Sequence, residues 1–352
     1  MFGGELGGLE QVFIDYGEVL HSRGHDIINL VAPGAKVIPS LKALGLPYLE
    51  IPNFNQYDIL AMARIRWRLK ALRPDAVIAQ GNRAIHLVKP AATRLAPFIA
   101  VNHSVNIRRT IGSDFVIAIN DDMLGRLVEA GQPADRVFKL FNMVRQPSPL
   151  PAPVALRSPP VIAAMGRFVA KKGFEVFIQA LAHLRDQGIP FRAILAGSGE
   201  LEMQLKTAAV ALGLGEVLYL PGWITDKAAF FAQTDIFCFT SVQDVCPLVL
   251  LEAFLNAKAV VMTDCRGPRE ISEDGVDSLL FPIDDAAALA ERIKSLINDP
   301  AFGRSLASAA QQKILENYTF DRAGARLEMI VESVVERWRY GKHQASGLRK
   351  SN

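Results

Sequence analysis

Residues 235–253, DIFCFTSVQDVCPLVLLEA, contain the pattern that decides the fold. A continuously apolar run is followed by a polar turn and then by a second apolar segment that starts with a proline. The first run suits a strand buried on both faces of a parallel sheet. Proline suits the first turn of a helix because its missing N–H has no partner to lose there. The stretch therefore predicts a strand, a loop and a helix that begins near Pro247.

Similar apolar runs recur along the whole chain, and longer helical patterns separate them. The runs of the first half are HDIINLVA (25–32), LPYLEIP (46–52), PDAVIAQ (74–80), APFIAVNH (96–103), DFVIAIN (114–120) and RVFKLFN (136–142). Those of the second half are PVIAAMG (160–166), FRAILAG (191–197), EVLYLPG (216–222), DIFCFTS (235–241), AVVMTD (259–264) and DSLLFP (277–282). Two such series predict an α/β protein with two doubly wound, Rossmann-like domains that face each other across a cleft.

The proline-rich segment RQPSPLPAPVALRSPP separates the two series. Proline fixes the backbone and removes an N–H donor, so this segment favours neither a helix nor a central strand. We therefore expect an N-terminal domain over residues 1–145, a linker over 146–159 and a C-terminal domain over 160–318. A long amphipathic helix is predicted for 319–340.

The start of the chain departs from the usual pattern of such domains. Gly3-Gly4 and Gly7-Gly8 come at once, without a strand before them. A missing central strand would leave backbone groups of the sheet unpaired. We therefore expect a truncated start rather than a domain that lacks its first strand.

Composition excludes several classes of protein. The chain has 352 residues, of which 50% are hydrophobic and 21% charged, so it is neither disordered nor of low complexity. A net charge of +3 gives no argument for a nucleic-acid partner. The N-terminus lacks a secretory signal pattern, no apolar run is long enough to span a bilayer, and the three cysteines lack metal-site spacing. We expect a cytoplasmic protein without a structural zinc.

A basic turn follows the first strand of the C-terminal domain, in the sequence GRFVAKKG (166–173). Arg167 and Lys172 lie five residues apart at the mouth of a predicted strand, where a guanidinium and an ammonium group would bind a diphosphate. A solvated basic loop is the alternative interpretation. Gly197, in AGSGE, follows the next strand, and a turn into a helix requires small residues whether or not phosphate binds.

Two acids, Asp244 and Glu252, flank the predicted helix start at Pro247. The free N–H groups and the dipole of a helix start favour an anion. A carboxylate at Glu252 could accept hydrogen bonds from the two vicinal hydroxyls of a ribose, and Asp244 is placed for the other end of a ligand. A surface acid with a capping acid is the alternative. Together with the basic turn, the two acids indicate a site for a nucleotide-diphosphate sugar.

Residues 64–73, RIRWRLKALR, contain five cations and no acid. Helical spacing places Ile65, Leu69 and Leu72 on one face and Arg66, Lys70 and Arg73 on another. The segment fits an ordinary amphipathic helix that packs on its sheet. The alternative is a basic face that docks on an anionic membrane or on a lipid-linked, phosphorylated acceptor. Under this alternative, we expect the protein to contact the inner face of the membrane peripherally.

Taken in order, the pieces GGLEQV, GRFVAKKGF, LAGSGELE, YLPGW, DVCPLVLLEAF and AVVMTDCRGPREI make the chain similar to a known family over residues 7–340. The chain resembles retaining GT-B glycosyltransferases of the group-1 class, family 4. The resemblance implies transfer of a sugar from a UDP-, GDP- or ADP-sugar to a glycan, a lipid-linked acceptor or a small molecule. It also implies a metal-independent reaction, with bacterial envelope polysaccharide or lipopolysaccharide as the expected product. No other cofactor is expected.

The resemblance also implies that the N-terminal domain binds the acceptor, that residues 160–318 bind the nucleotide sugar, and that the helix over 319–340 packs back on the N-terminal domain. It implies roles for single residues as well. Arg167 and Lys172 match cations that hold the donor diphosphate, and Glu252 matches a ribose-binding glutamate. Asp244 and His103 match residues that contact the transferred sugar, and a structural role is the alternative for His103, as for any lone histidine after a strand. Gly7 and Gly8 match a glycine turn that approaches the donor or the acceptor, and Gly197, in the matching piece LAGSGELE, is expected near the donor. Backbone contacts with the donor sugar and phosphate are implied for Cys246, Pro247, Leu248 and Val249.

The sequence departs from the family's pattern at two places. Asp244 stands where the family has a glutamate, which draws the carboxylate back by about 1.5 Å, one C–C bond. Val245 and Cys246 replace a glycine and an aromatic residue.

Three rival functions fit the same architecture. A nucleotide-sugar epimerase would act without an acceptor, so a product assay distinguishes it from a transferase. A phosphorylase would require a lysine for pyridoxal phosphate and a longer chain. A degenerate, non-catalytic member would only bind partners, and the pattern Arg167, Lys172 and Glu252 argues against it.

Overall fold

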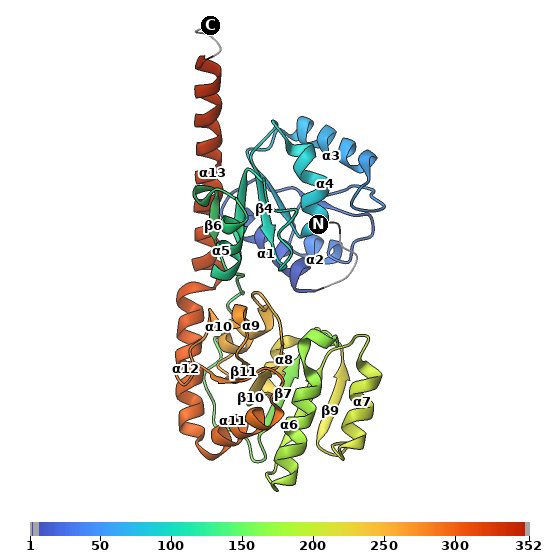
Figure 1. Cartoon of the computed structure of the whole chain (residues 1–352), viewed down its shortest axis with the longest axis vertical. Coiled ribbons are helices and arrows are strands. Elements are labelled where there is room, and N and C mark those ends of the chain that lie inside the picture. The colour runs from blue at the N-terminus through green and yellow to red at the C-terminus, as the bar shows by residue number, and fades with distance from the viewer. Residues whose placement is uncertain (1, 3–6, 349–352) are drawn as a thin grey trace. The chain divides into compact units, whose positions relative to one another are not determined.

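The computed structural model describes residue 2 and residues 7–348, with side chains as far as residue 340. It divides into two compact units (Figure 1). The first unit comprises Met1–Met143 and Thr319–Asn352, and the second comprises Val144–Tyr318.

The second unit is built on one parallel sheet with the order β12-β11-β10-β7-β8-β9. Its strands are β7 (Val161–Met165), β8 (Arg192–Ala196), β9 (Leu218–Gly222), β10 (Ile236–Phe239), β11 (Ala259–Thr263) and β12 (Leu279–Phe281). The first strand in the chain lies between the second and the fourth, which is the strand order of the doubly wound nucleotide-binding fold. Each strand falls inside one of the six apolar runs, so that prediction is confirmed.

Helices cover this sheet and bury its apolar strands (Figure 1). They are α6 (Phe174–Asp186), α7 (Glu202–Ala211), α8 (Lys227–Gln233), α9 (Leu248–Leu255), α10 (Arg266–Arg269), α11 (Ala286–Asn298) and α12 (Pro300–Asn317). Phe177 of α6, Ile293 of α11 and Leu195 of β8 lie in one hydrophobic core and have no exposed surface. At about 25 cal/mol per Å² of apolar surface, such side chains contribute roughly 2 kcal/mol each to folding.

The proline-rich segment belongs to the second unit and is bonded to it. Residues 145–160 form no helix or strand in the described chain. The Arg157 guanidinium pairs with Asp235 at 2.7 Å, and the Gln311 side chain donates to the carbonyl of Pro151 at 2.6 Å. The segment expected as a linker is thus fastened along the domain that follows it.

The first unit contains two parallel sheets. One pairs β1 (Asn29–Val31) with β2 (Tyr48–Glu50). The other has the order of its strands in the chain, β3 (Val77–Gln80), β4 (Phe98–Asn102), β5 (Phe115–Ala118) and β6 (Val137–Lys139). All six apolar runs of the first half contain one of these strands. No strand pairing joins the two sheets within the described part of this unit, and Gly3 and Gly4 lie outside the described residues.

The helices of the first unit are α1 (Gly8–Ser22), α2 (Ile38–Ala43), α3 (Ile59–Leu72), α4 (Asn82–Ala92), α5 (Asp121–Glu129) and α13 (Phe320–Leu348). α13 packs against α1, where an ion-pair cluster holds it. Glu328 accepts from Arg23 at 3.1 Å and lies 3.0 Å from His25 Nε2. His25, Glu328 and Glu332 could together hold a metal ion, but the Arg23 guanidinium already neutralises Glu328. None of the described helices is long and apolar enough to cross a membrane.

The basic segment 64–73 forms most of α3, with two departures from its predicted faces. Ile65 and Leu69 are buried as expected, but Leu72 is 39% exposed. Arg73 takes a left-handed backbone conformation (φ 49°) that ends the helix, so Leu72 lies in a terminal turn beyond the packed face. Arg66 does not belong to an outward basic face, because its guanidinium donates to the carbonyls of Ala91 and Thr93.

Candidate functional site

The carboxyl ends of β7 and β10 bring the predicted cation Lys172 to the predicted acid Asp244. Lys172 Nζ lies 2.5 Å from Asp244 Oδ2, and both side chains are 17% exposed. The same ammonium group lies 5.6 Å from the centre of the Phe239 ring. A low-dielectric setting strengthens both interactions. Asp244 therefore holds Lys172 in place at the edge of the sheet where ligands bind in open α/β folds.

Gly173 permits this arrangement. Its φ is +61°, and an added Cβ would overlap the carbonyl oxygen of Thr240. The Thr240 hydroxyl donates to the Lys172 carbonyl at 2.8 Å, and the Val242 N–H donates to the Lys171 carbonyl at 3.0 Å. One side chain–backbone and one backbone–backbone hydrogen bond thus join the basic turn to the loop after β10.

The glycine-rich turn after β8 has a structural reason for its composition. Gly197 has a φ of +148°, and a Cβ there would overlap the carbonyl oxygen of Gly166. The Phe168 N–H donates to the Ser198 carbonyl at 2.8 Å. Close packing against the basic turn accounts for Gly197, and its predicted contact with a donor stays a prediction. Arg167, in the same basic turn, is exposed.

The helix α9 begins at Leu248, one residue after Pro247, as predicted. No side chain among the described residues caps its first turn. Cys246 and Leu248 are buried, with 6% and 8% of their surface exposed, and Val249 is half-buried. A helix start with uncapped N–H groups carries a partial positive charge that favours an anion. The loop before α9 packs closely against Gly267, since a Cβ at that position would overlap the carbonyl oxygens of Asp244 and Val245.

Glu252, on α9, has a partner that sequence reasoning did not find. Lys227 Nζ lies 2.6 Å from Glu252 Oε1, while Oε2 is buried without a hydrogen bond to any described residue. Burial raises the pKa of the Glu252 carboxyl, and the Lys227 ammonium opposes this rise. The free oxygen leaves capacity to accept hydrogen bonds from hydroxyl groups. Lys227 is the first residue of α8, and Asp226 caps this helix by accepting from the Ala229 N–H at 2.9 Å. An acid that suits an N-cap marks the start of this helix in the sequence, but it does not indicate that Lys227 meets Glu252.

The other predicted residues belong to the first unit. Gly7 is the N-cap of α1, and Gly8 is the first residue of that helix. His103 follows β4, where its Nε2 is buried without a partner among the described residues. Burial lowers the pKa of the His103 imidazole to about 4, so the ring is neutral at ordinary pH. The roles of these three residues toward the donor stay predictions.

The second unit thus gathers two ammonium groups, two carboxylates and an uncapped helix start at one sheet edge, where they could hold an anion and a polyhydroxyl group together. With its α/β units and parallel sheets, the protein has the GT-B fold of sugar transferases. Residues 152–313 match the family "Glycosyl transferases group 1". The second unit therefore matches the group-1 glycosyltransferases over almost its whole length, which confirms the group-1 and GT-B parts of the resemblance seen in the sequence.

Two relatives of known class match almost the full chain. Lipopolysaccharide core biosynthesis glycosyltransferase LpsE of Rhizobium meliloti is 24% identical, over 90% of this chain and 93% of the relative. LpsD of the same organism is 26% identical, over 90% and 92%. Among solved structures, Anabaena HepE in complex with UDP superposes with a TM-score of 0.81, at 20% identity over 94% of this chain and 99% of that one.

Proposed function

We propose that this glycosyltransferase moves a sugar, with retention of configuration, from a nucleoside diphosphate sugar to a glycan or lipid-linked acceptor. The observation that carries the proposal is the pair of ion pairs, Lys172–Asp244 and Lys227–Glu252, on either side of the uncapped start of α9. In a nucleoside diphosphate sugar the diphosphate joins the ribose to the sugar, so in this proposal Glu252 meets the ribose, Lys172 and the start of α9 meet the diphosphate, and Asp244 meets the sugar.

The names of two relatives support the proposed class of product, and the ligands of one solved structure support the proposed class of donor. LpsE and LpsD are named for lipopolysaccharide core biosynthesis, so we propose an acceptor from an envelope polysaccharide or lipopolysaccharide. HepE has been solved with UDP and with UDP-glucose, so a UDP-sugar is the first donor to test. GDP- and ADP-sugars are tested beside it.

In this proposal the side chains of the second unit hold the donor. Lys172 and Arg167 neutralise the diphosphate together with the N–H groups of residues 246–249, and Glu252 Oε2 accepts from the ribose hydroxyls. Because Lys172 already contacts Asp244, the ammonium group has to bridge the carboxylate and the diphosphate when the donor binds. Asp244 then lies beside the sugar, where its shorter side chain favours a donor that differs from one fitted to glutamate.

The proposed reaction needs no metal, because cations and helix N–H groups stabilise the charge that develops on the leaving diphosphate. The bond from the sugar C1 to the diphosphate oxygen breaks, and a bond from C1 to the acceptor oxygen forms on the same face. The acceptor proton passes to the leaving diphosphate, which departs as the nucleoside diphosphate. No carboxylate is assigned as a covalent nucleophile. His103 is proposed to contact the transferred sugar as a neutral hydrogen-bonding group.

We also propose that the enzyme works in the cytoplasm, with peripheral contact at the inner face of the membrane through residues 64–73. Arg64, Arg68 and Lys70 are exposed on α3, and Trp67 is 62% exposed beside them. Exposed cations with an aromatic side chain suit an anionic interface. Replacement of these three cations by glutamine should reduce co-sedimentation with anionic vesicles, and unchanged co-sedimentation would exclude this face.

The test of the function is a product assay with EDTA present. UDP-, GDP-, ADP- and CDP-sugars are incubated with the protein and with an envelope glycan fraction, and the anomeric configuration of the product is read by NMR. We expect one donor class to give an acceptor-dependent glycoside with retained configuration. Conversion of the donor sugar without an acceptor would identify an epimerase, and an inverted product would contradict the proposed mechanism.

A further inference from the structure

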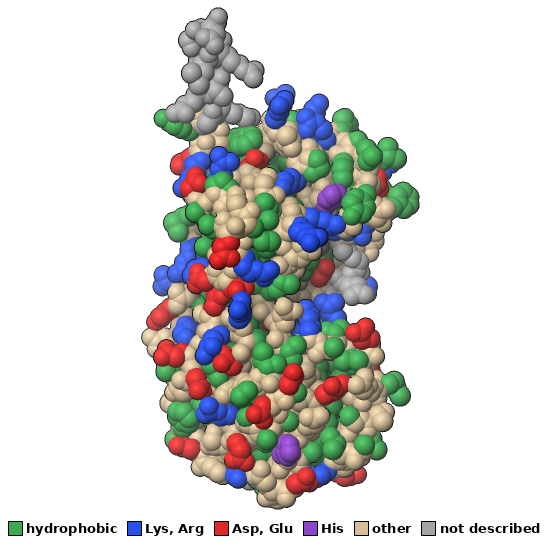
Figure 2. Space-filling view, in the orientation of Figure 1, with side chains coloured by type: hydrophobic (Ala, Val, Ile, Leu, Met, Phe, Trp, Pro, Cys, Tyr) green, Lys and Arg blue, Asp and Glu red, His purple; other side chains and the backbone are tan. Residues whose placement is uncertain are grey.

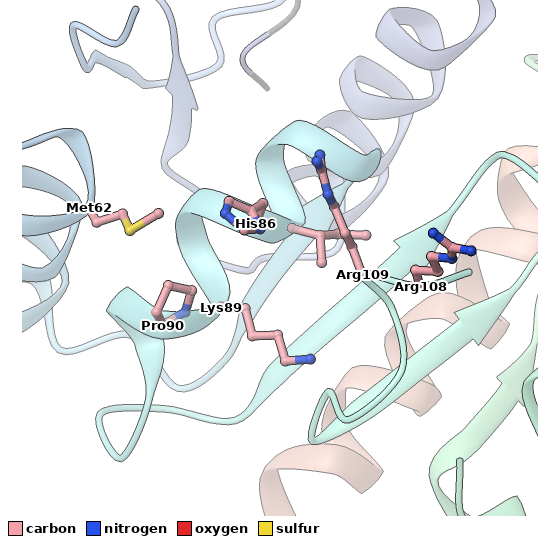
Figure 3. A pocket seen from close by; sticks show the side chains of 7 residues that line it. Met62, His86, Lys89, Pro90, Arg108 and Arg109 are labelled. Atoms are coloured by element: carbon pink, nitrogen blue, oxygen red, sulfur yellow. The ribbon is translucent and has the colours of Figure 1, made fainter. Parts of the chain in front are cut away.

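The first unit contains a cavity of about 430 Å³ between α3, α4 and the loop that follows β4. It is lined by Met62, Ile85, His86, Lys89, Pro90, Arg108 and Arg109. Figure 3 shows Met62 extending from α3 toward His86, with Lys89 further along the helix of His86 and Arg109 on the loop opposite. Four of the seven side chains are basic, and none is acidic.

The cations of this cavity form no ion pair with a carboxylate of the described residues. No carboxylate of the described residues lies within ion-pair distance of Lys89, Arg108 or Arg109. Lys89 Nζ donates to the carbonyl of Ile111 at 2.7 Å, and Arg109 donates to the amide oxygen of Gln56 at 2.5 Å. Neutral acceptors position the cations without cancelling their charge.

The electrostatics of the cavity favour an anion. Burial lowers the pKa of the Lys89 ammonium, and the charge of Asp114 only partly opposes this shift. Burial, followed by repulsion from Arg109, lowers the pKa of the His86 imidazole. A bound anion would relieve the repulsion between these groups. In Figure 2, Lys and Arg side chains gather beside a histidine on the drawn face of this unit.

Part of the cavity wall is apolar or aromatic. The Tyr57 ring meets the His86 ring edge to face at a centroid distance of 5.1 Å, and the Arg109 guanidinium lies 6.0 Å from the centre of the Tyr57 ring. Met62 and Pro90 complete the apolar side. A sugar or a hydrocarbon that carries the anion could pack on this side, while the anion contacts the guanidinium groups.

We infer that the cavity is a phosphoryl-binding site for a phosphate group carried by a sugar or by a lipid. Its assignment to the acceptor rests on the proposed function, in which the second unit holds the donor, and on the expectation from the resemblance that the N-terminal domain binds the acceptor. Phosphoryl binding itself can be measured without any sugar transfer.

The experiment measures binding of glucose 6-phosphate and inorganic phosphate to the full chain by calorimetry, with glucose as the neutral control. Arg108→Gln removes an exposed cation that forms no ion pair with a described residue, and Arg109→Gln removes the cation held by Gln56. Lys42→Gln is the matched control, because it removes one exposed positive charge from the same unit on α2. A second arm measures binding to phosphatidylcholine vesicles with and without phosphatidic acid.

We expect each arginine variant to weaken phosphate binding by about tenfold, as for loss of one charge-assisted hydrogen bond, and Lys42→Gln to leave it unchanged. Arginine-dependent binding of glucose 6-phosphate assigns the site to a soluble sugar phosphate. Arginine-dependent binding of phosphatidic acid vesicles alone assigns it to a lipid headgroup.

Two results would overturn the proposal: no probe binds, or Lys42→Gln weakens binding as much as Arg108→Gln. UDP binding, measured on the same samples, reports the donor site and the integrity of the fold. Loss of UDP binding with retained phosphate binding would therefore count against the proposed function and leave this inference standing.

Discussion

The charged site of the second unit and the cavity of the first unit balance their charges in opposite ways. In the second unit, Lys172 and Lys227 each contact a carboxylate within 2.6 Å. In the first unit, Lys89 and Arg109 contact only neutral oxygen atoms of described residues. A ligand of the second unit has to displace or share the carboxylates that pair with these two lysines. Only a ligand whose groups fit this arrangement can do so, which makes binding selective for geometry. A ligand of the first-unit cavity has to supply the missing negative charge itself, so its binding should depend more strongly on salt.

Removal of the Glu252 carboxylate should give the largest effect on the second-unit site. Glu252→Ala removes the proposed ribose acceptor and leaves Lys227 without its partner. We expect kcat/KM for the nucleotide sugar to fall by about 100-fold, which corresponds to roughly 2.7 kcal/mol. Glu216→Ala, which removes an exposed acid from the same unit, should leave the rate unchanged. Equal rates for Glu252→Ala and the wild type would refute the catalytic interpretation.

Gly173→Ala tests the backbone that joins the basic turn to the loop after β10. The added Cβ overlaps the Thr240 carbonyl in a left-handed conformation, so we expect a loss of about 3 kcal/mol in unfolding free energy. Gly188 has a similar φ of +69° but open space around its Cβ position, so Gly188→Ala should cost only about 1 kcal/mol. Denaturant unfolding of both variants measures the difference, and equal losses would show that the close approach is not tight.

His103→Gln distinguishes contact with the transferred sugar from binding of the nucleotide. If His103 contacts the transferred sugar, its loss should lower the transfer rate by about tenfold, the value of one hydrogen bond, with nucleotide affinity retained. Since its pKa is about 4, the wild-type rate should show no step from His103 between about pH 6 and pH 7. His183→Gln, at an exposed position of α6, is the control. A parallel loss of nucleotide affinity would contradict the role.

The pH dependence of donor binding should report Glu252. Burial raises the pKa of this carboxyl above 4.5, so acidification protonates it earlier than an ordinary glutamate. Nucleotide affinity should then fall roughly a few-fold as the pH is lowered from about 8 to about 5. The folded state binds this proton more readily than the unfolded chain, so the contribution of Glu252 to folding stability rises as the pH falls through the folded pKa. Glu252→Gln should abolish the pH dependence of affinity, and an unchanged dependence would assign it to another group.

The smallest expected effect concerns the cluster that holds α13 on α1. Glu328→Ala removes the partner of Arg23 and His25, whose side chains are 25% and 33% exposed. We expect a loss of about 0.5–1 kcal/mol in thermal or chemical unfolding, because partly exposed ion pairs contribute little. Glu332→Ala, one turn further along α13, should have no measurable effect. A larger loss for Glu332→Ala would assign the cluster's stability to that residue.

The strands and the start of α9 could be predicted from the sequence because they depend on local patterns. Continuous apolar runs marked all twelve strands found in the described residues, and Pro247 marked the start of α9 to within one residue. The partner of Glu252 could not be predicted, since Lys227 lies 25 residues away and meets it only through the sheet order.

The same limit explains the errors on α3 and the missed cavity. Periodicity placed Arg66 outward, but the free carbonyls at the end of α4 draw its guanidinium inward. Lys89 and Arg108 come from a helix and a loop with no shared motif, and only the packing of the loop after β4 brings them to one cavity.

The most direct test of the central claim is to measure nucleotide binding to the site of the second unit. Binding is detected as a thermal shift of the full chain in the presence of EDTA. UDP, GDP, ADP and CDP are compared on the wild type, on Lys172→Ala and on Lys171→Ala, where Lys171 is the exposed neighbour in the same turn. We predict that one nucleotide, at about 100 times its Kd, stabilises the wild type by roughly 2.7 kcal/mol. Lys172→Ala should lose this shift and Lys171→Ala should keep it. No shift with any nucleotide on a folded sample, or an equal shift in all three proteins, would contradict the account.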